Sequence, residues 1–171
     1  TLQGFAFIGC GDHSLTGANC NDLTAGGHNR DLGLIDGPGD LGIADANNMG
    51  AAMAPAAFDT LSRFFKDTGM KPDFFDAIVT GDLGKVGSRI LCELFKRENI
   101  NISDNHKDCG MMLYSFDEQD VHSGGSGCGC AGSVLCGYFI PQLRSGSMKN
   151  ILFAATGALM SPTMNQQGES I

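Results

Sequence analysis

Basic residues are scarce in this chain, which has 11 Lys and Arg against 19 Asp and Glu and a formal net charge of −8. A protein that binds nucleic acid displaces counterions from the phosphate backbone with clustered basic side chains. This composition offers little basic surface for that purpose. We therefore exclude nucleic acid as a partner.

Long apolar runs are also missing. No stretch reaches the roughly 18 apolar residues that a membrane-spanning helix requires. No basic and then apolar leader precedes Gly4, and position 1 is Thr rather than an initiator Met. We expect a soluble chain without a signal peptide, cut from a longer protein.

The seven cysteines are odd in number and scattered, and the chain is 42% hydrophobic. A core of that size needs no disulfides, so a reducing compartment is expected. Cys109, Cys128, Cys130 and His122 offer four zinc ligands, but one residue between Cys128 and Cys130 is too few for a zinc knuckle. We therefore expect no metal site.

Cys128 is the candidate for a thiol nucleophile, since a helix start lowers a thiol pKa and His122 is a potential base. The alternative is that these cysteines are small buried residues, the usual fate of free cysteine.

Apolar runs typical of buried strands alternate with helical patterns along the chain. This alternation predicts an α/β fold, a mostly parallel sheet with covering helices. The strands are expected at residues 2–8, 74–80, 111–114 and 151–155, and the helices at 45–65, capped by Asp45 or Asn47, at 86–95 and at 127–143.

A glycine-rich segment before the last helix is the most informative motif: His122, Ser123, Gly124, Gly125, Ser126 and Gly127. Its backbone N–H groups, with the helix start, can hold a carboxylate or phosphate without basic side chains. His122 can donate a hydrogen bond to that anion. The alternative is that the glycines only permit tight packing.

Polar residues also follow the expected strands, where open α/β sheets place their ligand sites. Asp82 is expected to cap the next helix or to face the site, since residues 80–88 lack the Gly-Lys-Ser/Thr ending of a nucleotide loop. Asp108 is a turn residue or a pocket wall. The neighbouring Asp104, His106 and Lys107 are interpreted as a solvated loop.

The last segment carries small residues and hydroxyls after a strand, among them Thr156 and Ser161, and these are expected to line the pocket. Residues 166–169 are interpreted as a loop that leads to a further strand outside the chain.

Several motifs together resemble the stage V sporulation protein AD family. They occur in the family's order over about residues 40–171, whereas residues 9–39 match poorly. The motifs are Asp40-Leu41-Gly42-Ile43, residues 48–57, Thr80-Gly81-Asp82-Leu83, Asp108-Cys109-Gly110, residues 124–130 and residues 156–167.

The resemblance implies one half of a thiolase-like fold. Residues 1–39 would be the end of the preceding half plus a linker, and residues 40–171 the carboxy-terminal half without its last strand. It also implies a protein that binds dipicolinic acid, a planar pyridine dicarboxylate stored with calcium. Its implied place is the spore, peripheral at the inner membrane, with other stage V sporulation proteins and the missing amino-terminal half as partners.

The resemblance implies a binding module without a cofactor. The ligand would lie on His122, Ser123, Gly124, Gly125 and Ser126, with Asp82, Asp108 and Ser161 on nearby loops. Two alternatives stay open: an acyl-CoA thiolase or condensing-type acyltransferase, and a structural interaction subunit. Against catalysis, the thiolase motif Gly-His-Pro-x-Gly-x-Ser-Gly is only partly matched at His122 and Gly125. Thr156-Gly157-Ala158 stands where thiolases have their second cysteine.

Overall fold

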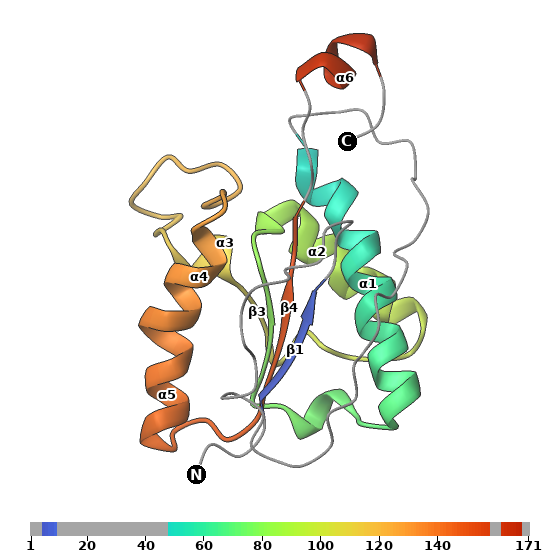
Figure 1. The fold of residues 1–171 in the computed structure, drawn as a ribbon, viewed down its shortest axis with the longest axis vertical. Helices are drawn as coiled ribbons and strands as arrows, with labels where there is room; N and C mark the ends of the chain where they lie inside the picture. The colour runs from blue at the N-terminus through green and yellow to red at the C-terminus, as the bar shows by residue number, and fades with distance from the viewer. Residues whose placement is uncertain (1–4, 10–47, 158–161, 169–171) are drawn as a thin grey trace.

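The computed structural model describes residues 5–9, 48–157 and 162–168 (Figure 1). The expected caps Asp45 and Asn47 lie outside these residues. The elements in chain order are β1 (Phe5–Gly9), α1 (Met49–Thr68), η3 (Pro72–Phe74), β2 (Ala77–Thr80), α2 (Gly84–Arg97), β3 (His106–Asp108), α3 (Cys109–Met112), α4 (Cys130–Val134), η4 (Leu135–Phe139), α5 (Ile140–Ser145), β4 (Ile151–Ala155) and α6 (Pro162–Gln167).

The four strands form one parallel sheet in the order β1-β4-β2-β3. The predicted α/β class is confirmed, because helices separate the parallel strands along the chain as such a sheet requires. Strand β1 pairs with β4 over its whole length, from Phe5 opposite Ile151 to Gly9 opposite Ala155. This sheet is consistent with part of a thiolase-like fold.

Helices cover both faces of the sheet, and each face has its own apolar core (Figure 1). Alternate strand residues point to opposite faces, so Ile78 and Leu152 pack with α1 and α2, whereas Val79 and Phe153 pack with α4, η4 and α5. Strand β2 is fully buried. This double burial explains why β2 and β4 are continuous apolar runs in the sequence.

The strand predicted at residues 111–114 is wrong. The chain forms α3 there, and the third strand of this region is the polar segment His106–Asp108. Asp108 ends β3 and caps α3, because its side chain accepts a hydrogen bond from the Met111 N–H. The cap turns the chain into a helix although the residues that follow are apolar.

The helix predicted at residues 127–143 is confirmed in the main, as α4, η4 and α5 follow without a break. The middle segment η4 is a π-helix. Pro141 has no N–H to donate to the carbonyl four residues earlier, which accounts for irregular pairing at this place. The loop predicted at residues 166–169 is partly wrong, because α6 extends to Gln167.

No helix among residues 48–157 and 162–168 has the length and apolar character needed to cross a membrane.

Candidate functional site at the carboxyl edge of the sheet

Three loops meet where the parallel strands end. The first follows β2, the second is the turn between β3 and α3, and the third is the glycine-rich segment before α4. Gly110 links them, because its N–H donates to the Gly81 carbonyl at 3.1 Å and its carbonyl accepts from the Gly125 N–H at 2.7 Å. The structure therefore brings the predicted Asp82, Asp108 and residues 122–126 to one edge of the sheet.

Asp82 connects the glycine-rich loop to the end of β4. One carboxylate oxygen accepts hydrogen bonds from the Ser126 hydroxyl at 3.0 Å and from the Gly127 N–H at 3.1 Å. The other accepts from the Thr156 hydroxyl at 3.3 Å, and that hydroxyl in turn accepts from the Asp82 N–H. The prediction that Asp82 caps α2 is wrong, because its side chain is committed to these partners.

Asp108 instead occupies the start of α2. Its buried carboxylate accepts from the N–H groups of Leu83 and Gly84 at 2.9 and 3.0 Å and from the Thr80 hydroxyl at 2.7 Å. Burial raises the pKa of Asp108, while these hydrogen bonds act in the opposite direction. The oxygen that accepts from Gly84 also accepts from the Met111 N–H at 3.2 Å in the turn into α3, so the observed role of Asp108 is to join α2, β2 and α3.

Three backbone donors of the glycine-rich loop have partners within the protein. The N–H of Gly124 donates to Val121, that of Gly125 to Gly110, and that of Gly127 to Asp82. The Ser123 carbonyl accepts from the Lys85 N–H at 2.8 Å. In this arrangement the loop itself covers the N-terminus of α2, and the exposed side chains of His122, Ser123 and Ser126 are the groups it presents to solvent.

His122 lies at the tip of this loop with its side chain 85% exposed, and its Nδ1 is 3.5 Å from an oxygen of Asp120. Its φ of +47° is in the left-handed region, which is uncommon for a residue with a side chain. A ligand at this edge would therefore meet the imidazole first. Ser161, the remaining predicted site residue, lies outside the described residues.

The cysteines divide by position. Cys109 and Cys130 are buried, and burial raises their pKa values to about 12 and about 11, so both are thiols at neutral pH. Cys128 is exposed and precedes α4 by two residues rather than starting it. Within residues 48–157, no group of three or more His, Cys, Asp and Glu side chains is placed to hold a metal ion.

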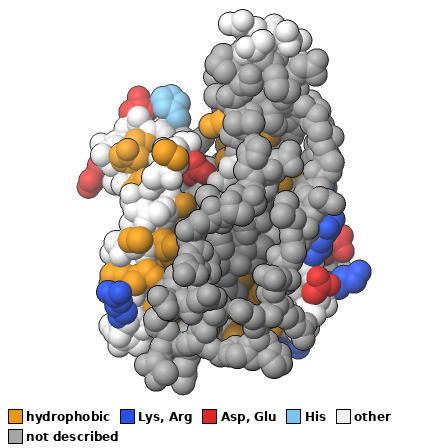
Figure 2. Space-filling view, viewed as in Figure 1, with side chains coloured by type: hydrophobic (Ala, Val, Ile, Leu, Met, Phe, Trp, Pro, Cys, Tyr) orange, Lys and Arg blue, Asp and Glu red, His pale blue; other side chains and the backbone are white. Residues whose placement is uncertain are grey.

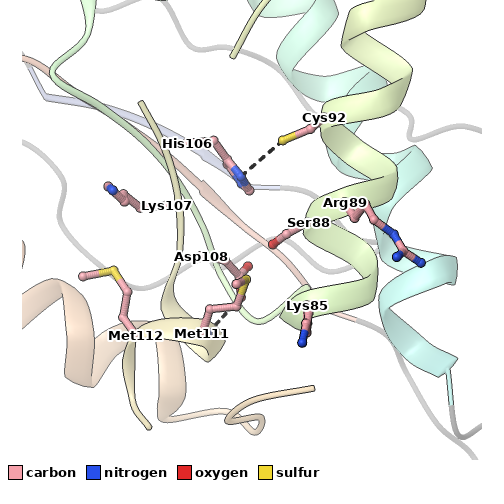
Figure 3. Close-up of a pocket in the computed structure, with 9 residues that line it drawn as sticks. All are labelled: Lys85, Ser88, Arg89, Cys92, His106, Lys107, Asp108, Met111 and Met112. Carbon is pink, nitrogen blue, oxygen red and sulfur yellow. Dashed lines mark hydrogen bonds between the residues drawn. The ribbon is translucent and has the colours of Figure 1, made fainter. Parts of the chain in front are cut away.

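Sequence reasoning missed His106, which was interpreted as a loop residue. Its ring joins a series of hydrogen bonds, in which Nδ1 lies 3.7 Å from the Cys92 sulfur (Figure 3). On the other side of the ring, Nε2 lies 3.0 Å from the Thr80 hydroxyl. Thr80 donates to Asp108, so its oxygen is free to accept from Nε2–H, and Nδ1 then accepts from the Cys92 thiol.

The surroundings keep the hydrogen-bonded pair of Cys92 and His106 uncharged. Burial, with a smaller repulsion from Lys107, lowers the pKa of His106 to about 4, and burial raises the pKa of Cys92. A neutral thiol and a neutral imidazole are not the ion pair of a cysteine nucleophile. The position of His106 follows from the pairing of β2 with β3, which puts Ile78 opposite His106. The two residues are far apart in the sequence, so the sequence around His106 gave no sign of this position.

The fold and this edge define a class of protein: an α/β domain with a doubly covered parallel sheet and a polar candidate ligand site where its strands end.

The family model described as Stage V sporulation protein AD matches residues 31–171, and the chain belongs to this family of sporulation proteins. The Stage V sporulation protein AD of Bacillus subtilis (strain 168) is 47% identical over 132 residues, which are 77% of this chain and 39% of that protein. The chain thus spans less than half the length of that relative. The family resemblance seen in the sequence is confirmed.

Proposed function

We propose that the protein binds dipicolinic acid, alone or as its calcium chelate, and supports its uptake into developing spores with other stage V sporulation proteins at the membrane. Family membership supports the sporulation context. The observation that carries the ligand site is the hydrogen-bonded junction of Asp82, Ser126 and Thr156 at the carboxyl edge of the sheet.

The exposed side chains at this edge suit a planar dicarboxylate. His122 and Ser123 are exposed donors beside the junction, and Leu113 and Tyr114 are apolar side chains that pack against Gly125. Carboxylates would accept hydrogen bonds from the donors while the ring lies on apolar surface.

The charge of the edge favours the calcium chelate over the free dianion. Asp82 is half-buried and acidic, and the chain carries a net charge of −8. A free dianion would be repelled by these charges, whereas calcium takes carboxylate oxygens as ligands and would bridge Asp82 to the ligand.

We propose binding rather than catalysis for this half of the protein. Thr156, at the position of the second thiolase cysteine, holds Asp82 in place through two hydrogen bonds. The buried thiols of Cys109 and Cys130 have raised pKa values, which disfavours a thiolate nucleophile there. Acyl transfer from a CoA thioester by the full-length protein would overturn this part of the proposal.

Calorimetric titration of dipicolinate into the full-length protein, with and without calcium, tests the proposal. We expect saturable binding that calcium strengthens, about tenfold weaker binding in His122→Ala, which corresponds to about 1.4 kcal/mol, and loss of the calcium effect in Asp82→Asn. The control Asp117→Asn removes an exposed carboxylate elsewhere and should bind normally. No binding at millimolar dipicolinate would refute the proposal.

A further inference from the structure

A separate pocket of about 400 Å³ lies between α2 and the β3–α3 turn (Figure 3). Its wall includes three basic side chains, Lys85, Arg89 and Lys107, and its floor includes Ser88. None of these four residues belongs to the dipicolinate site proposed above.

The pocket concentrates positive charge in an acidic protein. Three of the chain's 11 Lys and Arg residues line it, although the net charge is −8. Among the described residues, no ion pair joins these three cations to a carboxylate. Glu93, further along α2, pairs with Lys96 instead. Lys85 Nζ lies 5.6 Å from the centroid of the Phe116 ring, a contact that leaves its charge in place. Cations without a carboxylate partner around one hollow create a local positive potential.

The carboxylate at the base of the pocket does not neutralise these cations by direct pairing. Asp108 is 3% exposed, and its two oxygens accept hydrogen bonds from Thr80, Leu83, Gly84 and Met111. The neighbouring imidazole of His106 is neutral, because its pKa is about 4. The exposed charges that an entering ligand would meet are therefore those of the three basic side chains.

The Ser88 hydroxyl is an independent sign of a ligand. This residue is 7% exposed, and its oxygen is buried without a hydrogen-bond partner among the described residues. An unsatisfied buried hydroxyl costs about 1–3 kcal/mol. Figure 3 shows the side chain directed from α2 into the space beside β3. Because this oxygen is shielded from solvent, Ser88 would turn to another staggered rotamer to reach the pocket, where a ligand oxygen would supply the missing partner.

We propose that this pocket binds a compact oxyanion, the phosphate or carboxylate group of a small molecule. The Ser88 hydroxyl donates to one oxygen, and Lys85, Arg89 and Lys107 neutralise the charge. Arg89 and Lys107 extend to opposite sides of the pocket in Figure 3. Both are exposed, and exposed side chains change rotamer within nanoseconds, so their charged ends can turn toward an anion.

Titration of inorganic phosphate into the full-length protein at low ionic strength, followed by the ³¹P NMR line width, tests this site. We expect saturable binding that salt weakens. Binding should be lost in the triple variant Lys85→Gln, Arg89→Gln, Lys107→Gln. The matched control Lys66→Gln, Lys71→Gln, Lys96→Gln removes the same charge from exposed positions outside the pocket and should bind normally.

The variant Ser88→Ala distinguishes a specific anion site, in which Ser88 donates a hydrogen bond to the anion, from nonspecific attraction by the positive charges. We expect about tenfold weaker phosphate binding, the effect of one lost hydrogen bond to an anion. Equal losses in both triple variants, or unchanged binding in Ser88→Ala, would overturn the proposal. The variants Asp82→Asn and His122→Ala, which alter only the site proposed for dipicolinate, serve as site controls: normal phosphate binding in both supports a separate anion site, and weakened binding in either refutes it. If dipicolinate does not bind to the protein at all, the function proposed above is refuted, but the phosphate titration still tests this pocket.

Discussion

His106 shows how a single residue acquires its character from its surroundings. In the sequence it stands between polar residues, yet β3 brings it opposite Ile78 and close to Cys92 and Thr80. Burial disfavours the imidazolium, and the hydrogen bonds suit a neutral ring. The result is a histidine that stays uncharged well below neutral pH.

This residue makes stability depend on pH. The pKa of His106 falls from 6.5 in the unfolded chain to about 4 in the folded protein. Between these values the unfolded state takes up a proton that the folded state does not, so the free energy of unfolding falls as the pH is lowered through this window. The loss from His106 between pH 7.5 and pH 5 is about 2 kcal/mol.

Urea unfolding of the wild type and of His106→Gln at both pH values measures this contribution. Gln keeps an N–H donor for the Thr80 hydroxyl but has no titrating group. We expect the wild type to lose about 2 kcal/mol more than the variant on acidification. Equal losses in the two proteins would show that His106 does not titrate as the fold requires.

At the scale of elements, the glycine-rich loop is held by backbone contact with the β3–α3 turn. A Cβ on Gly124 would lie 2.6 Å from the Gly110 carbonyl oxygen, and the φ of Gly124 is +116°. The tight packing that the sequence left as an alternative to ligand binding is therefore present. It positions the exposed His122 and Ser123 at the edge of the sheet.

Gly124→Ala and Gly127→Ala form a matched pair for this contact. Gly127 has a similar φ of +111°, but nothing lies within 4 Å of its Cβ position. We expect Gly127→Ala to cost about 1 kcal/mol from backbone strain and Gly124→Ala at least about 1 kcal/mol more from overlap. Chemical denaturation measures both. Equal costs would mean that the loop moves away without penalty.

At the scale of the whole molecule, one helical surface lacks charge. The sequence has no charged residue from Cys130 to Leu143, and Figure 2 shows apolar side chains exposed along this side. Tyr138 is 44% exposed there. Exposed apolar surface of this kind is common at contacts between proteins.

We expect the 171-residue chain by itself to self-associate through this surface, and sedimentation velocity at increasing concentration measures the effect. Ser133→Glu places a charge on the exposed face and should shift the chain toward monomer. Met70→Glu, at an exposed apolar residue near the end of α1, is the control and should not. A monomer at all concentrations would contradict this prediction.

The sequence by itself determined the α/β class, because β2 and β4 are buried on both faces and must be continuous apolar runs, while amphipathic helices must repeat with the helical period. It also determined that polar residues gather at one edge, since parallel strands end on the same side. The family followed from motifs in order along residues 40–171.

Only the tertiary structure decided what the polar residues do. Asp82 is bound by Thr156, 74 positions away, and Asp108 caps a helix that begins 24 positions before it. His106 lies in a three-residue strand, too short to show a period. Strand pairing and loop packing bring these partners together from distant parts of the sequence. The residues next to each partner therefore carry no pattern that predicts the contact.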